Sequence, residues 1–353
     1  MRIAQVAPLY EAVPPKLYGG TERIVSFLTE ALVERGHDVT LFATGDAITK
    51  AELVAVRERA LRLDPSVRDT NAPHTLLLER VLRRADEFDV IHFHLDYLPF
   101  PIFSRQPVPW VTTLHGRLDL PELGPIFDTF SEAKVVSISD AQRRPLPQAS
   151  WAATVHHGLP RDLLTPQADG SEGYLAFLGR IAPEKRPDRA IRIAALSGLP
   201  LKIAAKVDRA DAEYFAGEIQ PLLGEANVDF IGEICDRQKP DFLSKARALL
   251  VPIDWPEPFG LVMIEAMACG TPVIAYPAGS VPEVVEDGLT GFIVRNEEEA
   301  AAAIGRLGEL DRSKIRARFE ERFTADRMAA DYEALYARLM LGSSRPLLRA
   351  VAG

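Results

Sequence analysis

Two basic side chains follow a predicted buried strand in the second half of the chain. Gly179 and Arg180 come directly after the apolar run 174–178, and Lys185 stands five residues further on. Gly179 permits a tight exit from a strand, arginine offers a bidentate fork, and lysine offers a mobile point charge. Arg180 and Lys185 could therefore hold a diphosphate, although a solvated loop with ordinary surface charges would explain the same pattern equally well.

A second segment places two glutamates around a predicted helix start. Glu257 precedes Phe259 and Gly260, and Glu265 lies about one turn inside a helix expected from Leu261. Free backbone amides at a helix start attract an anion, and carboxylates suit hydroxyl groups. The two carboxylates could reach different parts of one ligand. The alternative is that Glu257 is a helix-start charge and Glu265 a solvated residue on the helix face, but apolar neighbours flank Glu265.

Two glycine-containing motifs follow predicted strands in the first half. Gly19 and Gly20 precede a predicted helix, where paired glycines allow a ligand to approach the backbone closely. A plain capped helix start explains them equally well. His115, followed by Gly116, ends a predicted strand. We expect this histidine to face a cleft.

These motifs need elements that position them, and the chain alternates short apolar runs with longer amphipathic segments. That alternation is typical of parallel sheets with helices on both faces. Strands are expected at 3–7, 39–43, 90–93, 110–114, 135–138, 152–155, 174–178, 201–205, 228–231, 248–251 and 272–275. Helices are expected at 21–35, 187–196, 210–223, 240–245, 261–268, 297–310 and 325–340.

The alternation stops once and then restarts, which divides the chain. Residues 158–173 are rich in Gly, Pro and Asp and are predicted to be a linker. The fold class is therefore α/β, with two doubly wound parallel-sheet domains at 1–160 and 161–340. Open parallel sheets bind ligands at the carboxyl ends of their strands, so two facing domains would form a deep cleft. The segment 44–73 matches no expected element.

Composition and missing motifs exclude several classes of protein. The 353 residues carry a formal net charge of -9, and neither half is basic, which argues against a nucleic-acid partner. Dinucleotide, P-loop and nucleophile-elbow motifs are absent, as is any Asp-x-Asp pair for a metal. His92, His94 and Asp96 match no standard metal spacing. No signal peptide or apolar membrane span is found, so a cytoplasmic protein is expected.

Taken in order, the motifs resemble those of family 4 retaining glycosyltransferases, which have the GT-B fold of two Rossmann-like domains facing a cleft. The resemblance covers nearly the whole chain, including the spacing Glu-x7-Glu between Glu257 and Glu265. The matching segments are 19–22, 115–116, 179–185, 257–275, 279–283 and 287–291. Arg186 departs from the pattern, because the family commonly has glycine there.

The resemblance implies roles for residues of the second domain. Arg180 and Lys185 bind the donor diphosphate, Glu257 contacts the sugar hydroxyls, and Glu265 contacts the ribose hydroxyls. Three backbone amides, near Phe259, Gly260 and Leu261, help to hold the sugar and phosphate.

The resemblance also implies roles for the first domain. Gly20 lies close to the diphosphate, and His115 lies near the sugar and the acceptor. The segment 341–353 is expected to pack back on this domain.

The expected reaction is metal-independent transfer of a hexosyl group from a nucleoside diphosphate sugar to an acceptor hydroxyl, with the anomeric configuration retained. Glu257, His115, Arg180 and Lys185 form the expected catalytic set, and no cofactor is required. The acceptor is a small molecule, a lipid-linked sugar or a polysaccharide, with at most peripheral membrane contact. The alternatives are a sugar-nucleotide epimerase or phosphorylase of the same fold, and a sugar-nucleotide-binding protein without turnover.

Overall fold

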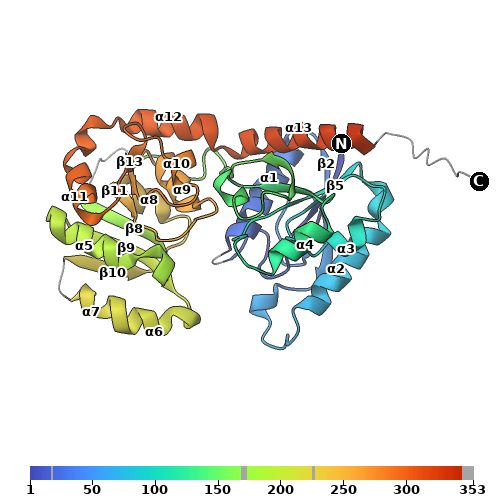
Figure 1. Ribbon diagram of the computed structural model, residues 1–353, viewed down its shortest axis with the longest axis horizontal. Coiled ribbons are helices and arrows are strands. Elements are labelled where there is room, and N and C mark those ends of the chain that lie inside the picture. Colours follow the sequence, from blue (N-terminus) through green and yellow to red (C-terminus); the bar gives the residue numbers. More distant parts are fainter. Residues whose placement is uncertain (17–18, 168–172, 225–226, 344–353) are drawn as a thin grey trace, which may run out of the picture. The chain divides into compact units, whose positions relative to one another are not determined.

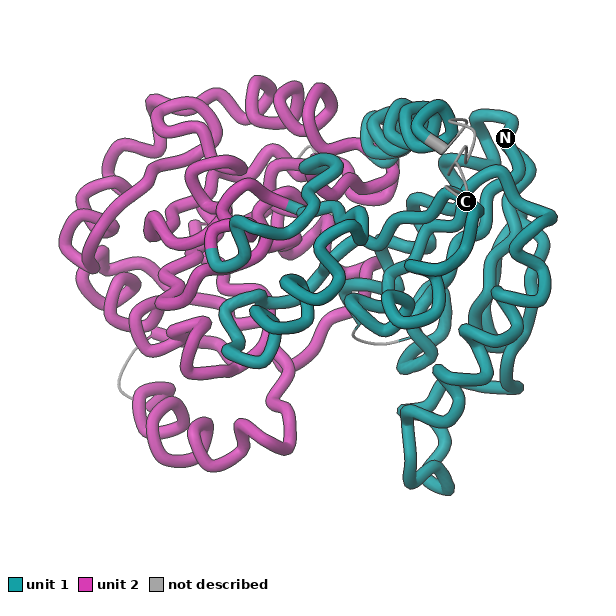
Figure 2. Tube along the Cα trace, turned by 45° about the vertical axis from the view of Figure 1, so that its right-hand side comes forward, with its two compact units in different colours: residues 1–138, 145–155, 325–353 teal, residues 139–144, 156–324 magenta. Residues whose placement is uncertain are grey.

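The computed structural model divides the chain into two compact units (Figure 2). We describe residues 1–16, 19–167, 173–224 and 227–343. Unit 1 contains Met1–Ile138, Pro145–Val155 and the chain from Ala325 on, and unit 2 contains Ser139–Arg144 and His156–Thr324. Each unit has its own parallel sheet.

Unit 1 is built on a seven-stranded sheet in the order β3-β2-β1-β4-β5-β6-β7. Figure 1 labels β2 and β5 of this sheet. All of its strand pairs are parallel, and the order reverses beside β1, as in doubly wound sheets. The strands are β1 (Arg2–Val6), β2 (Asp38–Thr44), β3 (Glu52–Arg57), β4 (Val90–Phe93), β5 (Trp110–Thr113), β6 (Lys134–Ser137) and β7 (Ser150–Thr154).

The helices of unit 1 cover this sheet with apolar side chains. They are α1 (Gly20–Glu34), α2 (Asn71–Arg83), α3 (Phe100–Phe103), α4 (Leu123–Thr129) and α13 (Ala325–Ser343). One core cluster joins α2 to Ala4, Val6, Ile91 and Phe93. Because side chains alternate along a strand, Gln5 and His92 face the other way, toward α13.

Unit 2 has a six-stranded parallel sheet in the order β10-β9-β8-β11-β12-β13. Its strands are β8 (Tyr174–Ile181), β9 (Leu201–Val207), β10 (Val228–Gly232), β11 (Ala246–Val251), β12 (Val273–Ala275) and β13 (Gly291–Ile293). Its helices are α5 (Pro187–Ser197), α6 (Ala212–Tyr214), α7 (Gln220–Leu223), α8 (Lys239–Ser244), α9 (Leu261–Ala268), α10 (Val281–Val284), α11 (Glu297–Gly305) and α12 (Arg312–Arg322).

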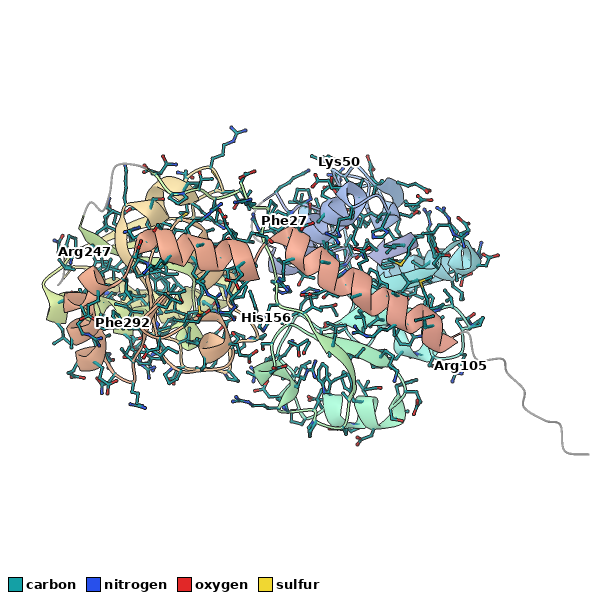
Figure 3. The ribbon with its side chains drawn as sticks, turned by 90° about the horizontal axis from the view of Figure 1, so that it is seen from above. Phe27, Lys50, Arg105, His156, Arg247 and Phe292 are labelled. Carbon is teal, nitrogen blue, oxygen red and sulfur yellow. The ribbon has the colours of Figure 1, made fainter. Side chains whose placement is uncertain are left out.

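The core of unit 2 forms where helices pack on its sheet. Helices α5 and α11 pack together, as do α9 and α12. Phe292 of β13, labelled in Figure 3, belongs to a buried cluster with Ile191 of α5 and Ala303 of α11. These apolar contacts fix the strands whose ends carry the predicted site residues.

The predicted α/β fold class is confirmed, and every expected strand is present within a few residues of its predicted ends. The prediction missed β3, which lies in the unmatched segment 44–73, and also β13, α10 and α12, and it gave no bounds for α2, α3 and α4. The helix predicted at 210–223 is present over 212–223, where a π-helical turn over Phe215–Ile219 joins α6 to α7.

The division into units falls at different residues from those expected. The chain passes into unit 2 at His156, apart from the short segment Ser139–Arg144, and returns to unit 1 at Ala325. The return was expected at 341, but the whole of α13 groups with unit 1 because it packs on α1 and β4. Within the expected returning segment, residues 344–353 lie outside the described part of the chain, as do 168–172 of the predicted linker.

Candidate functional site

In unit 2, the loops after β8 and β11 meet through an ion pair between Lys185 and Glu257. The same oxygen of Glu257, Oε2, also accepts a hydrogen bond of 3.0 Å from the indole nitrogen of Trp255. The Lys185 ammonium lies 4.9 Å from the centre of the Trp255 ring, within cation–π range. Glu257 is only 9% exposed. Two donors on one oxygen therefore fix the direction of a largely buried carboxylate.

The backbone of Glu257 is held by the segment before α10. Ser280 donates its backbone N–H to the carbonyl of Glu257 at 3.0 Å. A Cβ atom at Gly279 would lie 2.3 Å from both the nitrogen and the carbonyl oxygen of Glu257, and Gly279 has a φ of +57°. Only glycine fits this close approach without displacing Glu257.

Arg180 is the second-last residue of β8 and lies among carboxylates. Its guanidinium donates to Glu184 at 2.6 Å and to Asp211 at 3.0 Å, and Asp208 lies 3.8 Å away. The side chain keeps 29% of its surface exposed. Three surrounding carboxylates hold this cation in place, so an anionic ligand would compete with them for its donors.

The start of α9 supplies backbone donors directly after Glu257. Gly260 precedes the helix with a φ of +77°, and a Cβ atom there would lie 2.7 Å from Met263. Leu261 begins the helix, whose first amides have no partner within it. The Phe259 side chain is 2% exposed and its ring centre lies 4.9 Å from that of His157. Only the backbone of Phe259 could meet a ligand.

Glu265 lies inside α9 and is 4% exposed. Its Oε1 accepts a hydrogen bond of 2.6 Å from Lys239, the first residue of α8. Lys239 also lies 3.2 Å from Asp236. The alternative of a solvated Glu265 is therefore wrong, because this carboxylate is buried and paired.

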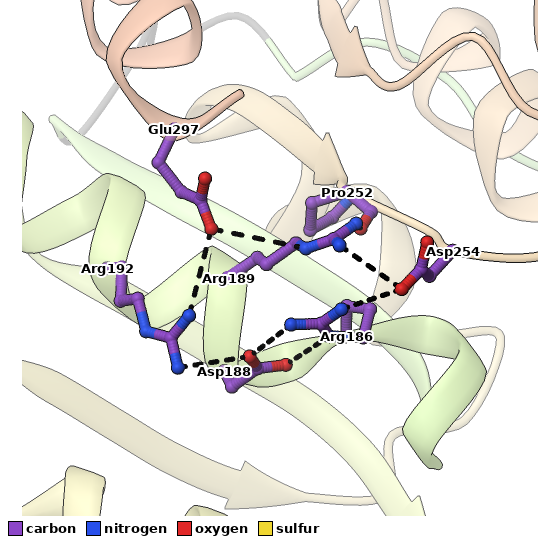
Figure 4. Close-up of polar contacts among 7 residues, drawn as sticks. All are labelled: Arg186, Asp188, Arg189, Arg192, Pro252, Asp254 and Glu297. Carbon is purple, nitrogen blue, oxygen red and sulfur yellow. Dashed lines mark hydrogen bonds and ion pairs between the residues drawn. The ribbon is translucent and has the colours of Figure 1, made fainter. Parts of the chain in front are cut away.

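Arg186 adopts a left-handed conformation, with a φ of +53°. That conformation costs a residue with a side chain about 1–2 kcal/mol, which explains why glycine suits this position. The guanidinium of Arg186 bonds Asp188 at 2.8 Å and Asp254 at 2.7 Å (Figure 4). Arg189 joins the same Asp254 carboxylate at 3.1 Å. These contacts tie the loop after β8 to the loop that carries Glu257.

In unit 1, Gly20 is the first residue of α1. A Cβ atom at the preceding Gly19 would lie 2.8 Å from Pro15 and 3.2 Å from Glu22. Burial raises the pKa of Glu22, and nearby Glu11 raises it further. Tyr18 lies outside the described residues. The structure places Gly19 at a close backbone approach within unit 1 itself.

His115 follows β5 and its Nε2 lies 2.9 Å from His94 Nδ1. Burial lowers the pKa of His115 to about 3, so its ring is neutral near pH 7. His92 bonds Tyr336 and Thr113, each at 2.7 Å. Within the described parts of the chain, no group of three His, Cys, Asp or Glu side chains could hold a metal ion.

Each predicted residue of the second domain has a defined place in unit 2. Lys185 and Glu257 form an ion pair. Arg180 bonds Glu184, the residue before Lys185. The Glu184 carbonyl accepts the backbone N–H of Asp254, in the loop that carries Glu257, at 3.0 Å. Glu265 instead pairs with Lys239. Gly20 and His115 belong to unit 1.

Trp255, Lys239 and the carboxylates around Arg180 were not predicted from the sequence. Trp255 could have been noticed, since it stands two residues before Glu257 and a tryptophan N–H seeks an acceptor when partly buried. Lys239 has no local pattern, because it lies 26 residues from Glu265.

Two family models match the chain in succession. Residues 18–154 match the model described as Glycosyltransferase Family 4, and residues 165–325 match Glycosyl transferases group 1. The chain belongs to glycosyltransferase family 4. The resemblance seen in the sequence is therefore confirmed, and this family 4 glycosyltransferase is an enzyme of glycosyl transfer.

Relatives and solved structures agree with that assignment. A phosphatidyl-myo-inositol mannosyltransferase of Mycolicibacterium smegmatis is 27% identical over 96% of this chain and 92% of its own length. A D-inositol 3-phosphate glycosyltransferase of Streptomyces bingchenggensis is 34% identical over 57% of this chain and 46% of its own. A glycosyltransferase involved in avilamycin A biosynthesis is similar in structure, with a TM-score of 0.74, 25% identity and coverage of 97% of this chain and 98% of its own.

A sucrose-phosphate synthase of Thermosynechococcus elongatus matches the fold with a TM-score of 0.77 at 22% identity, covering 97% of this chain and 99% of its own. The family 4 glycosyltransferase thus has the expected GT-B fold of two Rossmann-like domains. No helix in its described residues is long and apolar enough to cross a membrane.

Proposed function

We propose that this glycosyltransferase transfers a hexosyl group from a nucleoside diphosphate sugar to an acceptor hydroxyl, with retention of configuration and without a metal or cofactor. The observation that carries the proposal is the joining of Lys185 and Glu257 at the start of α9. It brings a cation, a carboxylate and helix-start amides to one place. A sugar diphosphate needs these three kinds of group.

Arg180, Lys185 and the amides at Gly260 and Leu261 stabilise the negative charge that grows on the departing diphosphate. Preorganised donors aimed at developing charge supply a large share of catalysis in such sites. Lys185 leaves Glu257 in part when phosphate oxygens arrive, and Arg180 shares its donors with Glu184. Positive side chains and the helix dipole thereby do the work that a divalent cation would do.

Glu257 accepts hydrogen bonds from sugar hydroxyls, and Glu265 accepts them from the ribose. As the acceptor oxygen forms its bond to the anomeric carbon, the bond from that carbon to the diphosphate oxygen breaks on the same face. The acceptor proton passes to the leaving diphosphate oxygen. One bond to the anomeric carbon forms as another breaks, and the proton moves to the leaving group, so the reaction needs no covalent intermediate with the enzyme. For unit 1, the proposal keeps the roles that the family resemblance implies, with His115 near the sugar and the acceptor and Gly20 near the diphosphate.

The acceptor is a hydroxyl-rich small molecule or a lipid headgroup, and the protein is cytoplasmic with at most peripheral membrane contact. Support comes from the names of two relatives, which act on phosphatidyl-myo-inositol and on D-inositol 3-phosphate. Free myo-inositol, its phosphate and vesicles containing phosphatidylinositol are therefore the first acceptors to test.

A thermal-shift panel with UDP, GDP, ADP and TDP sugars, each with and without EDTA, tests the donor assignment. One nucleotide class is expected to raise the melting temperature in an EDTA-insensitive way. Arg180→Ala should abolish the shift, whereas Arg192→Ala, which removes a largely exposed cation from α5, should keep it. A shift that needs a metal, or that survives in Arg180→Ala, contradicts the proposal.

Product analysis then separates transfer from its alternatives. Incubation of the stabilising donor with each acceptor should give a glycoside of unchanged anomeric configuration, read by proton NMR. Epimerised donor without an acceptor, or binding without any turnover, would support one of the two alternative functions instead.

A further inference from the structure

A chain of buried polar contacts begins where β1 and β4 meet α13. The sheet register pairs Gln5 with His92, and both are fully buried. Tyr336 of α13 covers them. Its hydroxyl lies 3.1 Å from Gln5 Nε2 and 2.7 Å from His92 Nδ1. A polar residue in the middle of a buried strand is thereby bonded to the last described helix.

The other end of the Gln5 side chain leads to His115. Gln5 Oε1 lies 2.9 Å from His94 Nε2, and His94 Nδ1 lies 2.9 Å from His115 Nε2. His94 is only 4% exposed. The contacts therefore run from α13 through Gln5 and His94 to His115, which follows β5.

These contacts fix where the protons lie. An amide oxygen can only accept, so His94 Nε2 carries the proton and donates to Gln5. Burying a charge without an oppositely charged partner is costly, so a neutral His94 is favoured and its Nδ1 accepts. His115 Nε2 must then donate to it, which leaves Nδ1 of the neutral His115 ring without a proton. This order holds as long as the Gln5 amide keeps its orientation.

The amide orientation of Gln5 follows from the number of acceptors that each end of its side chain meets. In the observed orientation, its NH₂ group donates to the Tyr336 hydroxyl and also points at His92 Nδ1, 3.5 Å away. The Tyr336 hydroxyl can then donate to His92 Nδ1. If the amide were flipped, its NH₂ group would face His94 Nε2, which offers a single acceptor for two N–H hydrogens. The ring nitrogens of His94 and His115 that carry protons would then be exchanged.

We infer that Gln5 is a positioning residue which, held by Tyr336 of α13, sets the tautomer of His115 through His94. In that tautomer Nε2 bears the proton and Nδ1 is a hydrogen-bond acceptor. The inference rests on the proposed function, which places His115 at the sugar and the acceptor. A family 4 glycosyltransferase with this arrangement uses its last described helix to set the hydrogen-bonding character of a site residue.

The test combines nitrogen NMR with kinetics on the full chain. With ¹⁵N-labelled histidine, and His115→Gln to assign the signal, the wild type should show a His115 ring protonated at Nε2. Gln5→Met keeps the volume but removes both polar links. It should mix the tautomers of His115 and lower kcat about tenfold, since one lost hydrogen bond shifts an equilibrium by roughly that factor. The donor KM should change little.

Two tyrosine variants on α13 provide a matched pair. Tyr336→Phe removes the hydroxyl that orients Gln5, and it should also mix the tautomers. Tyr332→Phe removes another buried hydroxyl from the same helix, whose partner is Thr113 at 2.8 Å. Because Tyr332 reaches Gln5 only through Thr113, His92 and Tyr336 in the described contacts, its variant should change the tautomer and kcat less than Tyr336→Phe does.

A wild-type His115 protonated at Nδ1, or an unchanged tautomer in both Gln5→Met and Tyr336→Phe, would overturn the inference. The NMR signal needs no substrate, so it is independent of the proposed function. Absent transfer by the wild type would instead count against the proposed function. Normal transfer by the wild type and by Gln5→Met alike would count against the positioning role alone.

Discussion

Gly279→Ala tests whether a close backbone approach positions Glu257. The new Cβ would lie 2.3 Å from the nitrogen and the oxygen of Glu257, so those atoms must move by about 1 Å to reach ordinary contact. Alanine at a φ of +57° costs about 1–2 kcal/mol, and overpacking adds about 1–3 kcal/mol. We therefore expect the free energy of unfolding to fall by about 2–5 kcal/mol.

Gly288→Ala is the matched control. Gly288 has a φ of +75°, and a Cβ atom added there would meet no other atom within 4 Å. The free energy of unfolding of this variant should fall only by the cost of the left-handed backbone, about 1–2 kcal/mol. Urea unfolding measures both free energies, and donor turnover measures the consequence for the site. A displacement of about 1 Å should lower the turnover of Gly279→Ala roughly a hundredfold, with little change in Gly288→Ala. Equal destabilisation and equal turnover of the two variants would refute the reasoning.

Three further predictions concern contacts that lie within unit 1 or within unit 2. Trp255→Phe keeps the ring beneath Lys185 but loses the bond to Glu257, so turnover should fall about tenfold in a steady-state assay, and unchanged turnover would contradict this role. Lys239→Met leaves the buried Glu265 without its 2.6 Å partner and should lower the free energy of unfolding by about 3–5 kcal/mol in urea titration, whereas a loss below about 1 kcal/mol would mean that Glu265 finds another partner. Because the pKa of His115 is lowered from 6.5 to about 3, the unfolded chain binds the extra proton between these values. Stability should therefore fall as pH drops through this window, by at most about 1.4 kcal/mol per pH unit from this group. Urea unfolding of His115→Asn at a series of pH values should show a shallower fall, and an identical pH dependence would contradict the assignment.

Much of the fold is predictable because its strands are continuous apolar runs between turn signals. The run 248–251 and the helix 261–268 show this, since burial on both sides of a parallel sheet leaves a strong pattern. β3 and β13 escaped prediction for a different reason. β3 is an edge strand with mixed polarity and β13 has only three residues, so tertiary pairing decides their structure.

The candidate site was predictable to the extent that its residues stand in local motifs. Glu257, Glu265, Arg180 and Lys185 were found in that way. The partners that hold them were not, because Lys239 and Trp255 act through contacts that depend on how loops of different strands meet. The left-handed backbone conformation of Arg186 was likewise not predicted, although the family's glycine at this position hinted at it.

The central claim is that the diphosphate of the donor binds at Lys185 and the start of α9. Calorimetric titration of a nucleoside diphosphate and the matching monophosphate, into the wild type and Lys185→Met, tests it most directly. The wild type should prefer the diphosphate by about tenfold or more, as a charge-assisted hydrogen bond predicts. Lys185→Met should lose most of that preference, while Lys314→Met, which removes an exposed lysine of α12, should keep it. An undiminished preference in Lys185→Met would contradict the claim.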